Sequence, residues 1–216
     1  MIAHVLHHIW VGPNSDPIDL IRAWREMHPG WELRLWREAD IRAFGLRNGD
    51  AFEAYLELRL WHGAANVARV EIVERLGGVY VDMDTIPLRP FDGGTFMRHG
   101  LFAGYVQPRP EYPGLIGNAY IGAVPGHPVL RTAMRMIANR RRLRPPWINT
   151  GVVVFTRAVE ASLRRGVDDI YIAPVHVFFP HDKIGIPAPP GRGLTYARHL
   201  WGSTKKSPWR YGRPVE

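Results

Sequence analysis

The sequence has 216 residues, of which 46% are hydrophobic and 22% are charged, and this composition is typical of a globular protein with one domain. It contains no cysteine, which excludes a disulfide framework and a zinc site built on cysteine. No run of about 18 apolar residues occurs, and the start lacks a basic segment and a cleavage site, so we expect neither a membrane-spanning helix nor a signal peptide.

The N-terminal segment predicts a strand followed by a helix. Val5–Val11 is a short apolar run that ends at Gly12, which is typical of a buried strand. Ile18–Met27 has the composition of a helix, and we expect Asp16 to be its N-cap and Pro17 its first residue.

A second strand and three helical pieces follow. Trp31–Trp36 alternates large apolar and polar residues, as strands do. Ile41–Leu60 is predicted to be helical in two pieces with a break near Asn48. Ala64–Leu76 has apolar residues at helical spacing and is expected to end at Gly77.

The rest of the chain continues the alternation of strands and helices. Pro128–Arg142 is expected to be a helix, and the Pro- and Gly-rich tail from Ile186 onward an ordered loop over the surface. The expected strands are Val79–Val81, Leu101–Val106, Ala119–Val124, Val152–Phe155, Ile170–Ile172 and Val175–Phe179. This alternation favours an α/β fold with a mostly parallel sheet.

Asp82 and Asp84 directly follow the apolar strand predicted for Val79–Val81. Because alternate residues of a strand point the same way, we expect both carboxylates on one side. Two like charges held close together repel each other, and a hard divalent cation with oxygen ligands offsets that repulsion. The carboxyl end of a strand is also where open α/β sheets bind ligands. The pair therefore predicts a metal-dependent ligand site.

The segment from Ala65 to Asp84 resembles the core of glycosyltransferase family 32, whose sugar-binding region contains a D-x-D motif. That family includes yeast initiating mannosyltransferases and bacterial capsule and lipooligosaccharide enzymes. Its pattern S-D-x-x-R-x-x-x-L-x-x-x-G-G-x-Y-x-D-x-D is matched here by Arg69, Gly77, Gly78, Tyr80, Asp82 and Asp84. Asn66 stands where the family has Asp, which puts the identity of the donor sugar in doubt.

The resemblance implies a GT-A fold, which is a Rossmann-like domain with a mixed, mostly parallel sheet flanked by helices. We expect one domain over residues 1–216. Residues 1–125 would form the half that binds the nucleotide sugar, and residues 126–216 the half that completes the metal site and binds the acceptor. The resemblance extends to the glycogenin-like transferases of family 8.

The resemblance implies that several residues contact the nucleotide-sugar donor. His8-Ile9-Trp10-Val11-Gly12 is similar to the family opening I-H-x-I-W-x-G, whose strand edge and Trp receive the nucleotide base. A core position is the alternative for Trp10. The donor contacts implied in this half of the chain are Ile9, Trp10, Asn66, Arg69, Tyr80, Asp82, Met83 and Asn118. A buried asparagine that satisfies a strand end is the alternative for Asn118.

Asn149-Thr150-Gly151-Val152 resembles both the Thr-Gly-Pro turn of family 32 and the N-x-G-V strand of glycogenin-like transferases. Either resemblance implies that Asn149 lies near the donor sugar or the acceptor.

The stretch from His199 to Trp209 resembles H-x-x-G-x-x-K-P-W of glycogenin-like enzymes, with two extra residues before its Pro-Trp pair. In those families the His completes the metal shell. The resemblance therefore implies a Mn²⁺ or Mg²⁺ site formed by Asp82, Asp84 and His199. It also implies donor contacts by Trp201, Gly202 and Lys205, with the Lys on the diphosphate. A solvated tail lysine is the alternative for Lys205.

The implied activity is a retaining, metal-dependent transfer of a hexose from a nucleotide sugar, with a UDP-sugar favoured over GDP-mannose. The acceptor would be a glycan, a lipid-linked molecule or a protein, as in polysaccharide biosynthesis. We expect a cytoplasmic location, with peripheral contact at the inner membrane surface as an alternative.

The net charge of +8 fits a polyanionic partner such as an acidic acceptor, an anionic membrane or nucleic acid, and a solvated basic surface is the alternative. The basic run Arg140–Arg144 can equally stabilise the C-terminal end of a helix by interacting with its dipole. A nucleic-acid-binding module is one rival function, although no binding signature for it appears.

A haloacid-dehalogenase-like phosphatase is the other rival, because Asp82-Met83-Asp84-Thr85 fits its D-x-D-x-T motif. That class needs a Lys between the motif and a later acidic pair. No Lys lies between Asp84 and Asp168, which counts against it.

Overall fold

The computed structural model describes residues 1–108, 114–139, 145–202, 209–210 and 213–214, with the backbone alone for the last two pairs. Its main feature is a six-stranded sheet with the strand order β2-β1-β3-β6-β5-β7. The strands are β1 (Val5–Ile9), β2 (Glu32–Trp36), β3 (Gly78–Val81), β5 (Leu101–Tyr105), β6 (Ile116–Ala123) and β7 (Ile170–Ala173). Strand β6 is antiparallel to β3 and β5, whereas the other neighbouring pairs are parallel, so the sheet is mixed as expected.

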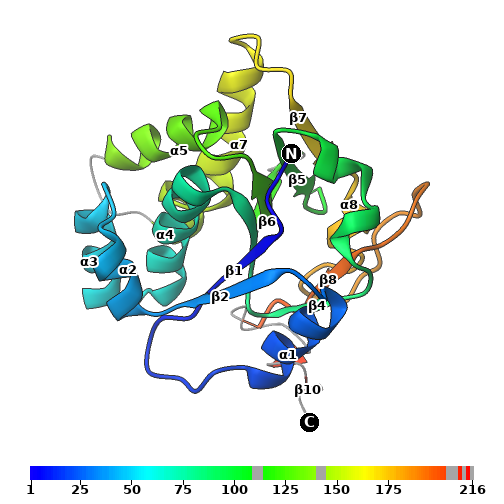
Figure 1. Ribbon diagram of the computed structural model, residues 1–216, viewed down its shortest axis with the longest axis horizontal. Coiled ribbons are helices and arrows are strands. Elements are labelled where there is room, and N and C mark those ends of the chain that lie inside the picture. The colour runs from blue at the N-terminus through cyan, green and yellow to red at the C-terminus, as the bar shows by residue number, and fades with distance from the viewer. Residues whose placement is uncertain (109–113, 140–144, 203–208, 211–212, 215–216) are drawn as a thin grey trace.

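Five helices cover one face of this sheet (Figure 1). They are α2 (Glu38–Phe44), α3 (Gly49–Glu57), α4 (Trp61–Leu76), α5 (Pro128–Ala138) and α7 (Val152–Leu163). Helix α4 lies in their middle, and every residue from Gly63 to Glu74 is buried. The polar side chains that α4 carries in this stretch, Asn66 and Arg69 among them, therefore need partners inside the fold.

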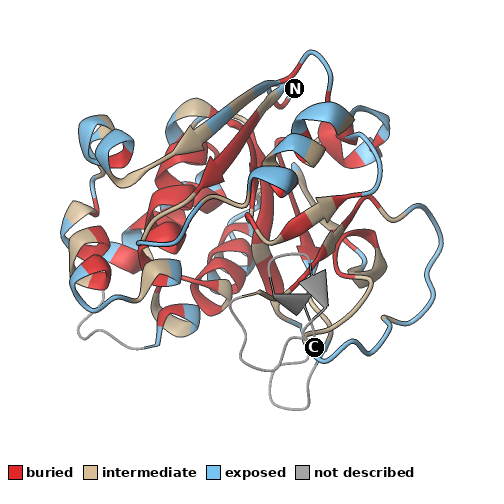
Figure 2. Ribbon diagram, turned by 90° about the horizontal axis from the view of Figure 1, so that it is seen from below, coloured by how far each residue is buried: buried red, intermediate tan, exposed pale blue. Residues whose placement is uncertain are grey.

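The opposite face is covered by α1 (Ile18–Met27), two 3₁₀ turns (Phe91–Gly93 and Thr95–Arg98) and α8 (Val175–Phe178). Their core is aromatic, and rings pack around the fully buried Phe91. Figure 2 shows the buried residues gathered in the strands and on the inward sides of the helices. The sheet thus separates two cores.

The turn from α4 into β3 explains the glycine pair before the two aspartates. Gly77 and Gly78 have φ angles of 68° and 84°, in the left-handed region that side chains with a Cβ rarely adopt. A Cβ on Gly78 would also lie 2.8 Å from the carbonyl oxygen of Val5. Glycine therefore lets β3 pair closely with β1.

A second, two-stranded sheet joins the C-terminal part of the described chain to the centre. Strand β4 (Thr85–Pro87) pairs with β8 (Ala197–His199), and Thr85 lies opposite His199. The amide of Leu200 donates to the carbonyl of Asp84 over 2.8 Å. The tail is thus more than the loop expected from Ile186 onward. A short helix, α6 (Pro146–Asn149), and a hairpin of β9 (Trp209–Arg210) and β10 (Arg213–Pro214) complete the described elements.

Two predicted strands are helices. Val152–Phe155 is the first turn of α7, and the run expected at Val175–Phe179 forms the single turn of α8 after Pro174. In α7 the apolar run is buried on several sides between α5, α6 and β6, so it lacks the polar face that distinguishes a helix from a buried strand.

The expected N-cap of α1 is also wrong. Pro17 occupies that position, no side chain caps the helix, and the carboxylate of Asp16 pairs with Arg37 instead. The run Arg140–Arg144 lies outside the described residues. Among the residues that the structure describes, no helix has both the length and the apolar character needed to cross a bilayer.

Candidate active site

The candidate site lies at one edge of the main sheet. The carboxyl ends of β1 and β3 meet there with the start of the antiparallel β6. The amide of Asp82 donates to the carbonyl of Ala119 over 2.9 Å, which fixes the first aspartate just beyond β3. This is the edge at which open α/β sheets bind ligands.

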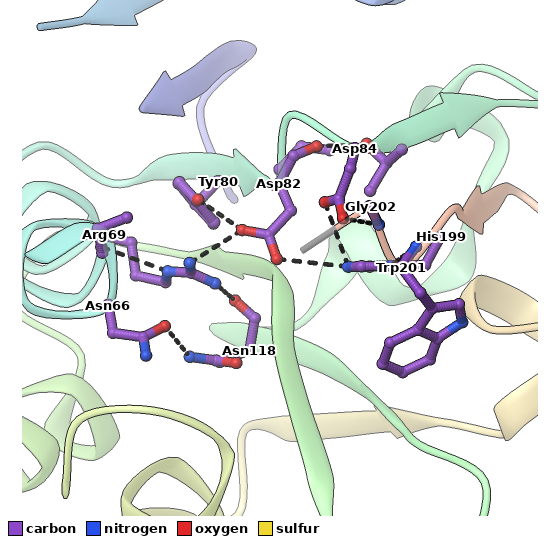
Figure 3. A network of polar contacts seen from close by, with 12 residues as sticks. Asn66, Arg69, Tyr80, Asp82, Asp84, Asn118, His199, Trp201 and Gly202 are labelled. Carbon is purple, nitrogen blue, oxygen red and sulfur yellow. Dashed lines mark hydrogen bonds and ion pairs between the residues drawn. The ribbon is translucent and has the colours of Figure 1, made fainter. Parts of the chain in front are cut away.

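Asp82 is held by two neighbours that share one of its oxygens (Figure 3). Its Oδ1 lies 2.9 Å from Nη2 of Arg69 and accepts the hydroxyl of Tyr80 over 2.6 Å. The Arg69 guanidinium is almost fully buried, stacks 4.4 Å from the centre of the Tyr80 ring and donates to the carbonyl of Asn118 over 2.7 Å. Burial alone would raise the pKa of Asp82, but Arg69, together with His199 and Tyr80, lowers it, so the carboxylate is ionised at neutral pH.

Asp84 is held from the other side by the C-terminal segment. The amide of Gly202 donates to its Oδ2 over 2.7 Å. Nε2 of His199 lies 3.4 Å from Oδ2 of Asp82 and 3.5 Å from Oδ1 of Asp84. The ligand atoms of all three residues lie within 4.8 Å of one another. Two carboxylates and one imidazole form a donor set that suits Mn²⁺ or Mg²⁺.

The hydrogen bonds of His199 define its protonation. Its Nδ1 accepts the amide of Trp201 over 2.9 Å, so the proton of the neutral ring is on Nε2 and faces the carboxylates. Burial lowers the pKa of His199, but Asp84 and Asp82 outweigh this effect and raise it. Nε2, which faces the carboxylates, is the nitrogen that would hold a cation. Trp201 itself has a φ of 57°, in the region that favours glycine.

A cavity of about 720 Å³ opens beside Asp82. Its inner wall consists of Asn66, Arg69, Asp82 and Asn118, and its outer wall of Gln107, Trp147, Lys183, Ile186 and Trp201. Two glycines of its lining are tightly packed. A Cβ on Gly117 would lie 2.6 Å from the Phe179 ring, and one on Gly151 would lie 2.8 Å from the Cα of Trp147.

The two asparagines of the inner wall are joined to each other. Nδ2 of Asn118 donates to Oδ1 of Asn66 over 3.0 Å, and Nδ2 of Asn66 approaches the Thr150 hydroxyl at 3.4 Å. The amide of Asn66, present where the family pattern has a carboxylate, can thus serve as acceptor and donor at once.

Several of the other predicted donor contacts are not among the residues that line this cavity. Ile9 is buried in β1, and the half-buried Trp10 that follows donates its indole N–H to the carbonyl of Asn14 over 2.9 Å. Met83 is buried between the two aspartates, and Asn149 ends α6. Lys205 lies outside the described residues.

Several residues that line the cavity were not identified from the sequence, among them His62, Trp147 and Lys183. His62 lies four residues before Asn66 on α4, so helical spacing could have placed it on the same face. Trp147 and Lys183 belong to no recognised motif, and their approach to the cavity depends on how α6 and the segment after α8 pack.

Comparison with known protein families supports the sequence pattern. A family model described as a glycosyltransferase sugar-binding region containing a DXD motif matches residues 15–99, which include both aspartates. An uncharacterized glycosyltransferase of Acanthamoeba polyphaga mimivirus is 30% identical over 194 residues, which cover 82% of this chain and 75% of the viral protein. Inositol phosphoceramide mannosyltransferase 1 of Schizosaccharomyces pombe is 27% identical over 144 residues, which cover 64% of this chain and 43% of that relative.

Solved structures show the same fold at low sequence identity. The PaToxG glycosyltransferase superposes with a TM-score of 0.62 at 16% identity, over 76% of this chain and 70% of its own. The UDP-bound glycosyltransferase domain of the YGT toxin has a TM-score of 0.53 at 10% identity, over 79% of each chain. The fold is therefore the GT-A fold expected from the sequence.

Proposed function

We propose that this chain, which belongs to the glycosyltransferases whose sugar-binding region contains a DXD motif, transfers a hexosyl group from a nucleotide sugar with the help of a divalent cation. The observation on which the proposal rests is the convergence of Asp82, Asp84 and His199, whose ligand atoms lie within 4.8 Å of one another beside the cavity. Membership of this family displaces the phosphatase and the nucleic-acid-binding module as rival functions.

Asp82, Asp84 and His199 are the proposed holders of Mn²⁺ or Mg²⁺. The chemistry that such a cation supplies when bound is Lewis-acid stabilisation of the charge left on the donor diphosphate. Arg69 keeps Asp82 ionised and oriented, and the amide of Gly202 fixes Asp84. Tyr80 acts through Asp82, because its hydroxyl donates to that carboxylate.

The donor sugar would lie against the inner wall of the cavity. Asn66 and Asn118 offer amide groups there that can hydrogen-bond to sugar hydroxyls. The base would lie on the other side of β3, at Ile9 and Trp10, where stacking on an indole is worth about 1–3 kcal/mol per base in nucleic-acid complexes. Contacts by Met83, Asn149, Trp201 and Lys205 stay predictions.

Retention of configuration is proposed together with proton transfer from the acceptor to the leaving phosphate. The carboxylates among the lining side chains are Asp82 and Asp182. Arg69 holds the first, and Oδ1 of the second accepts the amides of Ile184 and Ile186, each over 2.9 Å. Both carboxylates are therefore engaged, and the described part of the cavity wall offers no unpaired carboxylate as the nucleophile for a covalent intermediate.

A UDP-sugar is the favoured donor, with GDP-mannose as the second choice. The UDP bound by the YGT toxin domain supports the first, and the name of the fission-yeast mannosyltransferase supports the second. The net charge of +8 supports an acidic acceptor, among glycans, lipid-linked molecules and proteins. The cytoplasmic location and the division into two functional halves stay predictions.

The test is release of nucleoside diphosphate from a panel of UDP- and GDP-sugars with Mn²⁺, with and without EDTA. We expect one donor to be used, and both EDTA and Asp84→Asn to lower its turnover by about 100-fold or more, as loss of one charge-stabilising group does. Asp19→Asn is the matched control, because the Asp19 side chain is 89% exposed on α1. Release that survives both EDTA and Asp84→Asn would refute the metal-dependent mechanism, and failure of every nucleotide sugar to bind would refute the function.

A further inference from the structure

Trp147 is an exposed aromatic side chain close in sequence to two buried residues. Its neighbour Pro146 is buried and Thr150 is only 1% exposed, yet the indole is 40% exposed and lines the cavity. An isolated exposed tryptophan is ordinary on a protein surface. An exposed indole that lines a concave site is different, because pockets for organic ligands are walled by such groups.

The segment that carries Trp147 is held firmly. The carbonyl of Pro146 accepts the amide of Thr150 over 3.0 Å, the amide of Gly151 over 2.8 Å and the hydroxyl of Thr150 over 3.1 Å. A Cβ on Gly63 of α4 would lie 3.0 Å from the Pro146 ring, so α6 packs tightly on that helix. A ligand that stacked on Trp147 would therefore have little backbone freedom to restrict, which lowers the entropic cost of binding.

The position of Trp147 relates it to the acceptor. The diphosphate would lie at the end of β3 and the base toward β1, so the donor sugar would enter the cavity over β6. The Cβ built on Gly151 lies 3.0 Å from Nδ2 of Asn66 and 2.8 Å from the Cα of Trp147, which places α6 directly beside the inner wall. The cavity of about 720 Å³ is far larger than one hexosyl group and leaves room beyond the donor sugar.

The polar groups that line the cavity together with Trp147 suit a sugar ring. A pyranose has a face of C–H groups that packs on an aromatic surface, and hydroxyls at its rim that need hydrogen-bond partners. Gln107, Lys183 and His62 line the same cavity and offer both donors and acceptors. Burial, with Arg69, lowers the pKa of His62, so its ring is neutral at neutral pH and can donate from one nitrogen and accept at the other.

We propose that Trp147 is the stacking platform of an acceptor subsite that takes a sugar ring, so that the acceptor is a glycoside and its reactive hydroxyl belongs to a sugar. This inference rests on the proposed function, because it assumes a donor bound at Asp82 and Asp84. It assigns the outer wall of the cavity, apart from Trp201, to the acceptor and the inner wall to the donor.

The experiment measures two rates with the donor identified above, which are hydrolysis without acceptor and transfer to added acceptors followed by mass spectrometry. The acceptors are methyl glycosides of common hexoses, a serine- and threonine-containing peptide, and octanol. The variants are Trp147→Ala and Trp147→Phe, and Leu163→Ala is the control, because Leu163 is 50% exposed and lies away from the cavity.

We expect transfer to at least one glycoside, with Trp147→Ala raising the KM for that acceptor about tenfold or more, since loss of a stacking surface costs about 1–3 kcal/mol. Donor hydrolysis and donor KM should stay within about twofold of the parent value, and Trp147→Phe should restore most of the acceptor affinity. An equal loss of hydrolysis and transfer in Trp147→Ala would overturn the proposal. Hydrolysis by the parent without transfer to any glycoside, or transfer to the peptide or octanol alone, would also overturn it. Absence of hydrolysis and transfer altogether would refute the proposed function itself.

Discussion

The two walls of the cavity are built in opposite ways. The inner wall is centred on a buried and cross-linked side chain, because Arg69 is only 4% exposed and is bonded to both Asp82 and Asn118. The outer wall is open, and its Trp147 and Ile186 are 40% and 50% exposed. Its side chains donate to loop carbonyls, as Nε1 of Trp201 does to the carbonyl of His181 over 3.1 Å.

This difference separates two tasks. Charged groups near a leaving diphosphate must keep their positions and their ionisation, which buried, fully bonded side chains do best. An acceptor must enter and leave, so its contacts are surfaces that remain exposed before it binds. Substitutions should therefore damage stability at the inner wall and its supports, and spare it at the outer wall.

The largest effect on stability should come from acidification, because β1 carries two buried histidines. His7 and His8 each donate a ring N–H to a backbone carbonyl, that of Gly77 and that of Val81 respectively, over 3.0 Å, and burial lowers the pKa of each to about 4. Since an unfolded histidine titrates near 6.5, the unfolded chain binds more protons between about pH 6.5 and pH 4. Stability should thus be complete above that window and fall by about 3 kcal/mol per histidine as the pH drops through it.

Urea unfolding of the parent, His8→Asn and His4→Gln at several pH values tests this. Asn can still donate to the Val81 carbonyl but does not titrate, so it should remove about half of the pH dependence. The His4 side chain is 60% exposed, so His4→Gln is the control. An unchanged slope in His8→Asn would contradict the assignment.

Substitution of Arg69, the positively charged side chain of the inner wall, should have the next largest effect on stability. Arg69→Met leaves Asp82 charged without its main partner, and breaking a buried ion pair costs about 3–5 kcal/mol. We expect the lower end of that range, because the Asp82 side chain is 21% exposed. Thermal unfolding gives the measurement, and Arg22→Met, on a surface pair 63% exposed, is the control. Equal melting temperatures for the two variants would show that the Arg69–Asp82 pair contributes no more to stability than an exposed surface pair does.

Metal binding should stabilise the protein slightly less. At a concentration about 100 times Kd, Mn²⁺ should add about 2.7 kcal/mol, which corresponds to roughly 5–10 °C in Tm for a chain of this size. The shift should vanish in Asp84→Asn and persist in Trp147→Ala, because only the first removes a proposed ligand. A shift that Asp84→Asn retains would locate the cation elsewhere.

The smallest effect is expected at the outer wall. Ile186→Ser should change the free energy of unfolding by no more than about 0.5 kcal/mol, as is usual for exposed positions. The same variant should weaken acceptor binding, since Ile186 lines the cavity. A loss of stability comparable with that of Arg69→Met would show that the outer wall is part of the core.

Much of the inner wall could be predicted because its information is local. Helix α4, the glycine pair, β3 and the two aspartates follow one another within residues 61–84, and each is defined by short-range sterics and periodicity. The sequence pattern therefore gave the order of the elements and the convergence of Asp82 and Asp84. It also indicated His199, through resemblance, as their partner.

The errors fall where burial overrides the local pattern. Val152–Phe155 was expected as a strand because a run of four apolar residues fits either a buried strand or a buried helix. Its neighbours α5, α6 and β6 decide for the helix, and no short segment contains that information. The error at Asp16 has the same cause, because its carboxylate pairs with Arg37, 21 residues away, and does not cap α1.

By itself, the sequence determined which groups are available for chemistry. These are the two aspartates, the glycines that let β3 pair closely with β1, and residue types suited to a divalent cation. Only the tertiary structure decided what surrounds them. Pairing of β4 with β8 brings His199 to aspartates 115 and 117 positions earlier, and the packing of α6 on α4 brings Trp147 to the cavity. Such contacts follow from the burial of apolar surface summed over the whole chain, and no local preference specifies them.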